Sequence, residues 1–97
     1  DVGLLGLTIP HEYGGQGMTQ YEYAKAMEEV ARRCGGTAVF TNAHQSIGLR
    51  AILLFGTEEQ KKAVLPQLAS GEHLAAFALT EPEAGSDASN VQTRADY

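Results

Sequence analysis

Two helix-capping sequences restrict the fold of this chain more than any other feature. They are Thr19-Gln20-Tyr21-Glu22 and Thr57-Glu58-Glu59-Gln60. In each, a threonine is followed three positions later by Glu or Gln, which is the pattern of a capping box. The two side chains satisfy free backbone N–H groups in the first helical turn, so a helix is expected to begin after each threonine.

Apolar residues repeat at spacings of three and four after the first cap, which is the period of a helix with one buried face. The repeat predicts a helix over residues 20–33, which Gly35-Gly36 ends. Its solvent side carries opposite charges four positions apart, which predicts two ion pairs, Glu28 with Arg32 and Glu29 with Arg33.

Two more helices are expected further along the chain. The first covers residues 37–55 and ends at Gly56, and its C-terminal half is apolar nearly all round, which predicts burial between other helices. The second begins at the Thr57 cap and ends at Ser70-Gly71. It is expected to be bent or restarted at Pro66, because proline lacks a backbone N–H.

The pattern changes near residue 74, where a short apolar run, Leu74 to Leu79, precedes a turn-rich stretch, Thr80 to Asp87. An apolar run bounded by turn signals is typical of a buried strand, and a second strand is expected from Val91. The expected fold class is therefore mainly α, with antiparallel helices that lead into the first strands of a β region.

The 97 residues, 43% of them hydrophobic, suffice for one compact domain or for a piece of a larger one. We expect a piece, since the sequence opens at Asp1 without a methionine and closes just after a strand-like segment. The net charge of −5 and the lack of any basic cluster longer than a pair exclude a surface that tracks nucleic-acid phosphates.

Cys34 is the single cysteine, so no internal disulfide can form. Neither a secretory signal nor an 18-residue apolar span occurs, and an intracellular, reducing compartment is expected. We expect Cys34 to be a half-buried, inert thiol. His44 and Gln45 fall within an apolar helix and are expected to be hydrogen-bonded packing, whereas His11 and His73 have no companion at metal-ligand spacing.

Thr80 and Ser86 are the strongest candidates for ligand contacts. Short hydroxyl side chains can donate to ring atoms or phosphate oxygens at little cost in conformational entropy. Gly85 lets backbone N–H groups approach an anion closely. The alternative is an ordinary turn, in which Ser86 and Asp87 cap neighbouring backbone groups.

The segment Ala78-Leu79-Thr80-Glu81-Pro82-Glu83-Ala84-Gly85-Ser86-Asp87 resembles a signature of the acyl-CoA dehydrogenases. These flavoenzymes oxidise fatty acyl-CoA thioesters. The family pattern closes with a small residue where this chain has Asn90. That departure bears on the strand after the loop and not on the ligand contacts.

Three further segments are similar to the same family, in the same order. Residues 12–17 resemble its early Tyr-Gly-Gly crossing, and residues 55–61 and 65–72 resemble its fourth-helix region. The stretch Ala43-His44-Gln45-Ser46-Ile47-Gly48 is most like the very-long-chain branch and a close relative that assists respiratory complex I assembly.

The resemblance implies that residues 1–72 belong to an N-terminal helical domain and that residues 73–97 begin a middle β domain. It also implies FAD as the cofactor, contacted by Phe77 and Leu79 through backbone atoms and by Thr80 at the isoalloxazine ring. Gly85 and Ser86 would lie at the pyrophosphate, with Ser86 also touching the acyl-CoA substrate.

The implied reaction converts long- or very-long-chain fatty acyl-CoA to trans-2-enoyl-CoA in fatty acid β-oxidation. Its catalytic base is a glutamate in a C-terminal domain that this chain lacks, so no catalytic residue and no metal ligand is expected here. The resemblance further implies an electron-transfer flavoprotein as acceptor, a homo-oligomeric parent (dimer or tetramer), and the bacterial cytoplasm or mitochondrial matrix.

Two alternatives stay open. The same fold serves acyl-CoA oxidases, in which oxygen reoxidises the flavin. The chain could instead be a non-catalytic helical module for assembly, which predicts an exposed apolar patch and no flavin.

Overall fold

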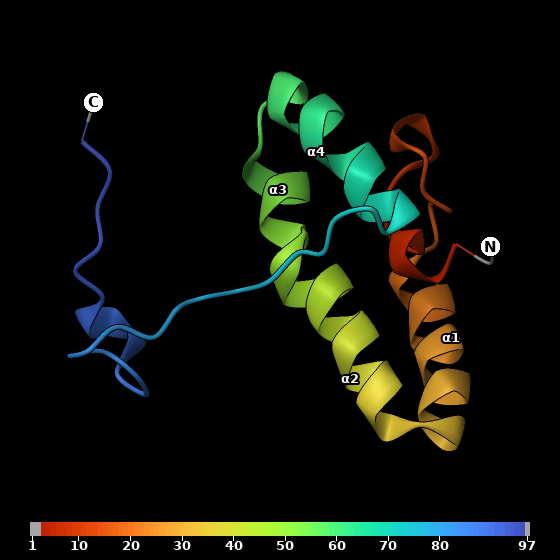
Figure 1. Cartoon of the computed structure of the whole chain (residues 1–97), viewed down its shortest axis with the longest axis horizontal. Helices are drawn as coiled ribbons and strands as arrows, with labels where there is room; N and C mark the ends of the chain where they lie inside the picture. Colours follow the sequence, from red (N-terminus) through yellow and green to blue (C-terminus); the bar gives the residue numbers. More distant parts are fainter. Residues whose placement is uncertain (1–2, 97) are drawn as a thin grey trace.

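The computed structural model describes residues 3–96 and is mainly helical (Figure 1). The elements in chain order are η1 (Leu4–Gly6), η2 (His11–Tyr13), α1 (Gln20–Arg33), α2 (Gly35–Asn42), η3 (Ala43–Gly48), α3 (Arg50–Phe55), α4 (Glu58–Ser70) and η4 (Ala88–Asn90). The helices α1 and α2 form an antiparallel hairpin, and α4 folds back beside α3. The mainly α, antiparallel fold class is therefore confirmed.

Helix α1 begins and ends where the sequence predicts. The Thr19 hydroxyl accepts a hydrogen bond from the Glu22 backbone N–H at 3.3 Å, and the Glu22 carboxylate accepts one from the Thr19 N–H at 2.8 Å. This reciprocal cap satisfies two backbone donors that the first turn leaves without helical partners.

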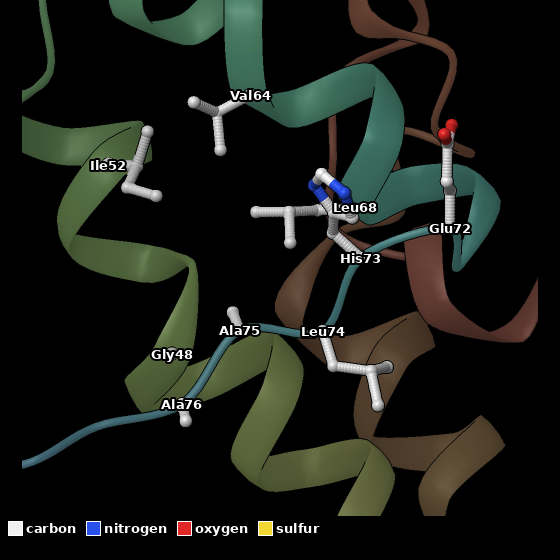
Figure 2. A pocket seen from close by; sticks show the side chains of 9 residues that line it. All are labelled: Gly48, Ile52, Val64, Leu68, Glu72, His73, Leu74, Ala75 and Ala76. Atoms are coloured by element: carbon white, nitrogen blue, oxygen red, sulfur yellow. The ribbon is translucent and has the colours of Figure 1, made fainter.

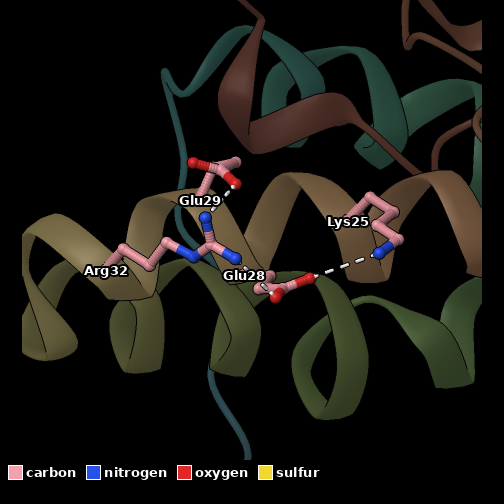
Figure 3. Close-up of polar contacts among 4 residues, drawn as sticks. All are labelled: Lys25, Glu28, Glu29 and Arg32. Atoms are coloured by element: carbon pink, nitrogen blue, oxygen red, sulfur yellow. Dashed lines mark hydrogen bonds and ion pairs between the residues drawn. The ribbon is translucent and has the colours of Figure 1, made fainter.

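Charged side chains line the exposed side of α1 (Figure 3). The predicted pair between Glu28 and Arg32 is present at 3.0 Å, but Glu29 also pairs with Arg32, at 3.1 Å, and not with Arg33 as predicted. Lys25 adds a contact to Glu28 at 3.5 Å. All these side chains are exposed to solvent, so each pair contributes only about 0.3–0.5 kcal/mol.

The predicted helix over residues 37–55 is interrupted. Helix α2 already begins at Gly35, after a single extended residue at Cys34, so Gly35-Gly36 opens a helix instead of ending one. Within the run, η3 is a π-helix, whose wider turn brings the adjacent residues His44 and Gln45 both into the interior, at 1% exposure each. Their prediction as hydrogen-bonded packing is confirmed.

Helix α4 opens with the second predicted capping box. The Thr57 hydroxyl accepts from the Gln60 N–H at 3.2 Å, and the Gln60 side chain accepts from the Thr57 N–H at 2.9 Å. The helix continues through Pro66 without restarting and ends at Gly71, where φ is +83°. Glycine takes this left-handed conformation without the steric penalty that a Cβ would bring.

The hydrophobic core lies between α4, α3 and the N-terminal crossing. Gly15 allows this crossing to fold tightly, because a Cβ there would lie 2.1 Å from the Ile9 carbonyl oxygen. Beside it, the Tyr13 hydroxyl donates to the Glu58 carboxylate at 2.7 Å, and this bond raises the pKa of Tyr13 to about 12. The buried core cluster comprises Ile9, Tyr13, Leu49, Leu65, Leu68 and Ala69.

Helix α3 is not buried between other helices, contrary to the sequence prediction. Leu54 and Phe55 are 59% and 85% exposed. Within residues 3–96, α3 packs mainly on η3 and α4. None of the helices in that range is long and apolar enough to span a membrane.

The two predicted strand segments carry no strand within residues 3–96. Residues 74–76 pass along α3 and α4, the chain then leads away from the helices (Figure 1), and one isolated antiparallel bridge joins Glu81 to Ala84. A strand exists only when its backbone pairs with a second one. The start of a β domain at residue 73 therefore stays a prediction.

Candidate functional site

The candidate loop closes on itself through Glu81. Its backbone N–H donates to the Ala84 carbonyl at 2.9 Å, and Ala84 donates back at 3.2 Å. Its carboxylate accepts from the Gln92 and Thr93 N–H groups, at 2.9 and 3.0 Å, and from the Thr93 hydroxyl. These bonds, led by the one from Gln92, lower the pKa of Glu81, because they favour its charged form.

Asn90, where the chain departs from the family pattern, also takes part in this closure. Its side-chain amide donates to the Glu83 carbonyl at 3.0 Å. Ala84 lies inside the closed loop at 3% exposure. The loop therefore owes its shape to the Glu81 carboxylate and the Asn90 amide, as an internal polar framework.

The two hydroxyls expected to bind the ligand take no part in this framework. Thr80 and Ser86 are exposed, and neither side chain has a hydrogen-bond partner among the residues that the structure describes. Gly85 is also exposed, with nothing within 4 Å of the place that a Cβ would occupy. The expected alternative for Ser86, a cap on a neighbouring backbone group, is absent from this part of the chain, whereas Asp87 accepts from the Ser89 hydroxyl.

The five expected cofactor contacts lie along one stretch, Phe77 to Ser86. Phe77 and Leu79 are 55% and 42% exposed. The stretch projects from the helices (light blue to blue in Figure 1). The stretch thus presents free hydroxyls, an open glycine and exposed apolar groups, and its contact with a cofactor stays a prediction.

A separate apolar groove of about 600 Å³ lies between α3, α4 and the segment that leads to the loop (Figure 2). Ile52, Val64 and Leu68 point into it from the two helices. Gly48 lets the chain pass closely, because a Cβ there would lie 2.7 Å from the Ala75 Cβ. None of the predicted site residues lines this groove.

One further residue, Cys34, differs from expectation. Cys34 is exposed and not half-buried, and hydrogen bonds from the Thr37 hydroxyl and backbone lower the pKa of its thiol. The hydrogen-bonded packing of His44 also reaches beyond the helices, because its Nδ1 accepts from the Ala75 N–H at 3.0 Å and so connects them to the loop segment. In the sequence, the signal for this contact was a pair of adjacent polar residues, His44 and Gln45, in an apolar helix.

Comparison with known proteins decides the family. The sequence profile of the acyl-CoA dehydrogenase N-terminal domain matches residues 1–72. This chain belongs to the acyl-CoA dehydrogenase family.

No group of three or more metal-ligating side chains occurs in residues 3–96.

Several acyl-CoA dehydrogenases are similar to almost the whole chain. The human mitochondrial very long-chain specific enzyme is 50% identical over 95 residues, which are 98% of this chain and 14% of that protein. An acyl-CoA dehydrogenase of Bacillus subtilis is 47% identical over 93 residues, 96% of this chain and 24% of that protein. The chain therefore spans a quarter or less of these relatives.

Solved structures of the family have the same fold. An acyl-CoA dehydrogenase from Bacillus anthracis complexed with FAD superposes with a TM-score of 0.86 at 52% identity, over 94% of this chain and 15% of that one. Butyryl-CoA dehydrogenase from Megasphaera elsdenii gives 0.81 at 41% identity, over 94% and 24%.

Proposed function

We propose that this chain is part of an FAD-dependent acyl-CoA dehydrogenase that oxidises long- or very-long-chain fatty acyl-CoA to trans-2-enoyl-CoA. The observation that carries the proposal is the loop of residues 80–87, whose own framework leaves Thr80 and Ser86 free for a ligand. Similarity to a relative complexed with FAD supports the cofactor, and 50% identity to a very long-chain enzyme supports the substrate class.

In this proposal the residues of the chain bind and orient FAD and the substrate, but they do not accept the proton that the substrate loses. Phe77 and Leu79 offer backbone groups, the Thr80 hydroxyl donates to the flavin ring, and Gly85 and Ser86 offer donors to the pyrophosphate. Ser86 also contacts acyl-CoA. Bound FAD supplies the acceptor for the two electrons removed from the substrate. The proton acceptor comes from outside residues 1–97.

We assign residues 1–72 to a helical N-terminal domain and residues 73–97 to the start of a β domain. The extent of the family match and the end of α4 at Ser70 support this division. The parent protein is proposed to be an intracellular homo-oligomer, in the mitochondrial matrix or the bacterial cytoplasm, in line with one mitochondrial and one bacterial relative. An electron-transfer flavoprotein is its proposed acceptor, in line with a structural neighbour from a study of such a protein.

A helical assembly module is the second candidate. The exposed apolar side chains of the α2–η3–α3 run favour it, since such a surface can pack on a protein partner. They are Val39, Phe40, Ile47, Leu54 and Phe55. This candidate requires no flavin.

The visible spectrum of the purified full-length protein separates these functions. Flavin bands that bleach when palmitoyl-CoA is added without oxygen support a flavin-dependent oxidation. Subsequent mixing with air then separates the reaction types, because rapid stoichiometric peroxide formation indicates an oxidase and slow reoxidation indicates a dehydrogenase. A protein without flavin bands, even after incubation with FAD, contradicts the proposal and favours the assembly module.

A further inference from the structure

His44 is held in one tautomer by its three backbone neighbours. Its Nδ1 lies 3.0 Å from the backbone nitrogen of Ala75, a group that can only donate, so Nδ1 must be the unprotonated acceptor. Its Nε2 lies 3.1 Å from the Leu5 carbonyl oxygen and 3.2 Å from that of Leu68. Carbonyl oxygens only accept, so Nε2 carries the hydrogen and shares it between them.

These bonds join three parts of the chain at one buried point. Leu5 belongs to η1, Leu68 lies in the last turns of α4, and Ala75 lies in the extended segment between α4 and the loop. His44 itself is 1% exposed. Its imidazole has both nitrogens satisfied and leaves none for a ligand, so its role is to hold backbone in place.

The neighbouring Gln45 has a parallel but separate role. Its side chain donates to the Leu4 carbonyl at 2.9 Å and accepts from the Thr8 N–H at 3.1 Å. It is buried to the same extent as His44. Gln45 thus fixes only the N-terminal crossing, whereas His44 also reaches the segment that leads to the loop.

That segment has few other polar attachments, although Ala75 also packs against the hydrophobic core. Among residues 74–80, the bond from Ala75 to His44 is the one hydrogen bond found in the described chain. Gly48, on the same π-helix, lets the Ala75 backbone approach. The position of the segment is therefore set at Ala75, two residues before Phe77.

We propose that His44 is a positioning residue for the ligand loop. It fixes the point at which the chain leaves the helices, and so determines where the stretch from Phe77 to Ser86 begins. The contribution to cofactor binding rests on the proposed function, whereas the fixing of Ala75 does not.

Variants of the full-length protein can test the hydrogen bonds of Nδ1 and of Nε2 separately. In His44→Asn, the amide oxygen is as many bonds from Cα as Nδ1 and can accept from Ala75. In His44→Gln, the amide nitrogen is as many bonds from Cα as Nε2 and can donate to Leu5 or Leu68. Gln45→Leu is the matched control, since it removes two hydrogen bonds at an equally buried neighbour.

Hydrogen exchange of the Ala75 amide is the first measurement, made by mass spectrometry on peptides that cover residues 73–80. We expect about fivefold faster exchange in His44→Gln, the change set by one net hydrogen bond, and near wild-type exchange in His44→Asn. Gln45→Leu should speed exchange near Thr8 and leave Ala75 unchanged. The proposal predicts that exchange at Ala75 is faster in His44→Gln than in the other two variants. An exchange rate that depends only on the melting temperature of each variant would overturn it.

The rate of FAD release from the same proteins is the second measurement. We expect His44→Gln to release FAD faster than His44→Asn or Gln45→Leu, when variants with the same decrease in melting temperature are compared. Equal release from all three variants, despite faster exchange at Ala75, would overturn the positioning role. A wild-type protein that holds no flavin contradicts the proposed function instead, and the exchange test of His44 remains decisive on its own.

Discussion

The helical part of the chain, residues 3–72, and the extension that follows it are stabilised in different ways. The helices are fixed by caps and by a core in which Ile9, Leu49 and Leu65 are fully buried. The loop in the extension is shaped by Glu81 and Asn90, and the segment before it is tied to the helices at Ala75, by the bond to His44 and by packing on the core. The helical part thus has a hydrophobic core of its own, whereas the loop has a local shape held by hydrogen bonds.

The largest effect is expected from a core truncation. Leu65→Ala should lower the free energy of unfolding by about 2–5 kcal/mol, because it leaves a cavity at a fully buried site. Leu74→Ala, at a side chain that is 55% exposed, is the matched truncation in the extension and should cost less than half as much. Denaturant unfolding of the full-length variants measures both. Equal losses would mean that Leu74 is covered in the full protein as thoroughly as Leu65.

Removal of the free hydroxyls should affect the ligand and not the fold. Ser86→Ala should weaken FAD binding by roughly 30-fold, since a hydrogen bond to a charged phosphate contributes about 2 kcal/mol, and Thr80→Ala by about fivefold. Ser89→Ala, in the same loop, is the control, because its hydroxyl is already bonded to Asp87. Titration of the apoprotein with FAD gives the affinities. Three variants with the affinity of wild type would place the cofactor away from this loop.

The caps should contribute at a smaller, local scale. Thr19→Ala and Thr57→Ala should each lower the free energy of unfolding by about 1 kcal/mol, because each removes a side-chain acceptor from a helix start. Thr93→Ala is the comparison in the extension: it removes a donor to Glu81 and should loosen the loop without changing helix stability. Thermal unfolding and exchange of residues 81–93 distinguish the two effects. A cap variant as stable as wild type contradicts this assignment.

The smallest effect is a pH dependence confined to the loop. The pKa of Glu81 is lowered by its bonds to Gln92 and Thr93, so these bonds stabilise the loop above the ordinary glutamate pKa and are lost as the pH falls through the lowered value. Exchange at Gln92 and Thr93, corrected for intrinsic rates, should differ between wild type and Glu81→Gln at neutral pH. The difference should vanish at acidic pH. A constant difference at every pH would show that the charge of Glu81 is not involved.

The same contrast explains which features the sequence could predict. The start of α1 at Gln20 and the end of α4 at Ser70 follow from a capping box and a glycine, whose effects are local. The interruption at η3 escaped prediction because it depends on Leu5, Leu68 and Ala75, which are distant in sequence from His44. Neighbours in the chain cannot indicate such a tertiary requirement.

The sequence did not predict how the candidate loop is organised, and its ligand contacts stay a prediction. Thr80, Gly85 and Ser86 were identified from residue type and resemblance, and the structure leaves them open to a ligand. The role of Asn90 in closing the loop was missed, since its departure from the family pattern drew attention to the strand instead. The apolar character of α3 indicated burial, yet the atoms that would cover it are not in residues 3–96.

The most direct test of the central claim is an experimental structure of the full-length protein with FAD bound. The account predicts that the Thr80 and Ser86 hydroxyls lie within hydrogen-bond distance of the flavin ring and the pyrophosphate, respectively, while Glu81 and Asn90 keep their bonds within the loop. It also predicts that Ala75 still donates to His44. FAD bound elsewhere, with both hydroxyls facing solvent, would contradict the account.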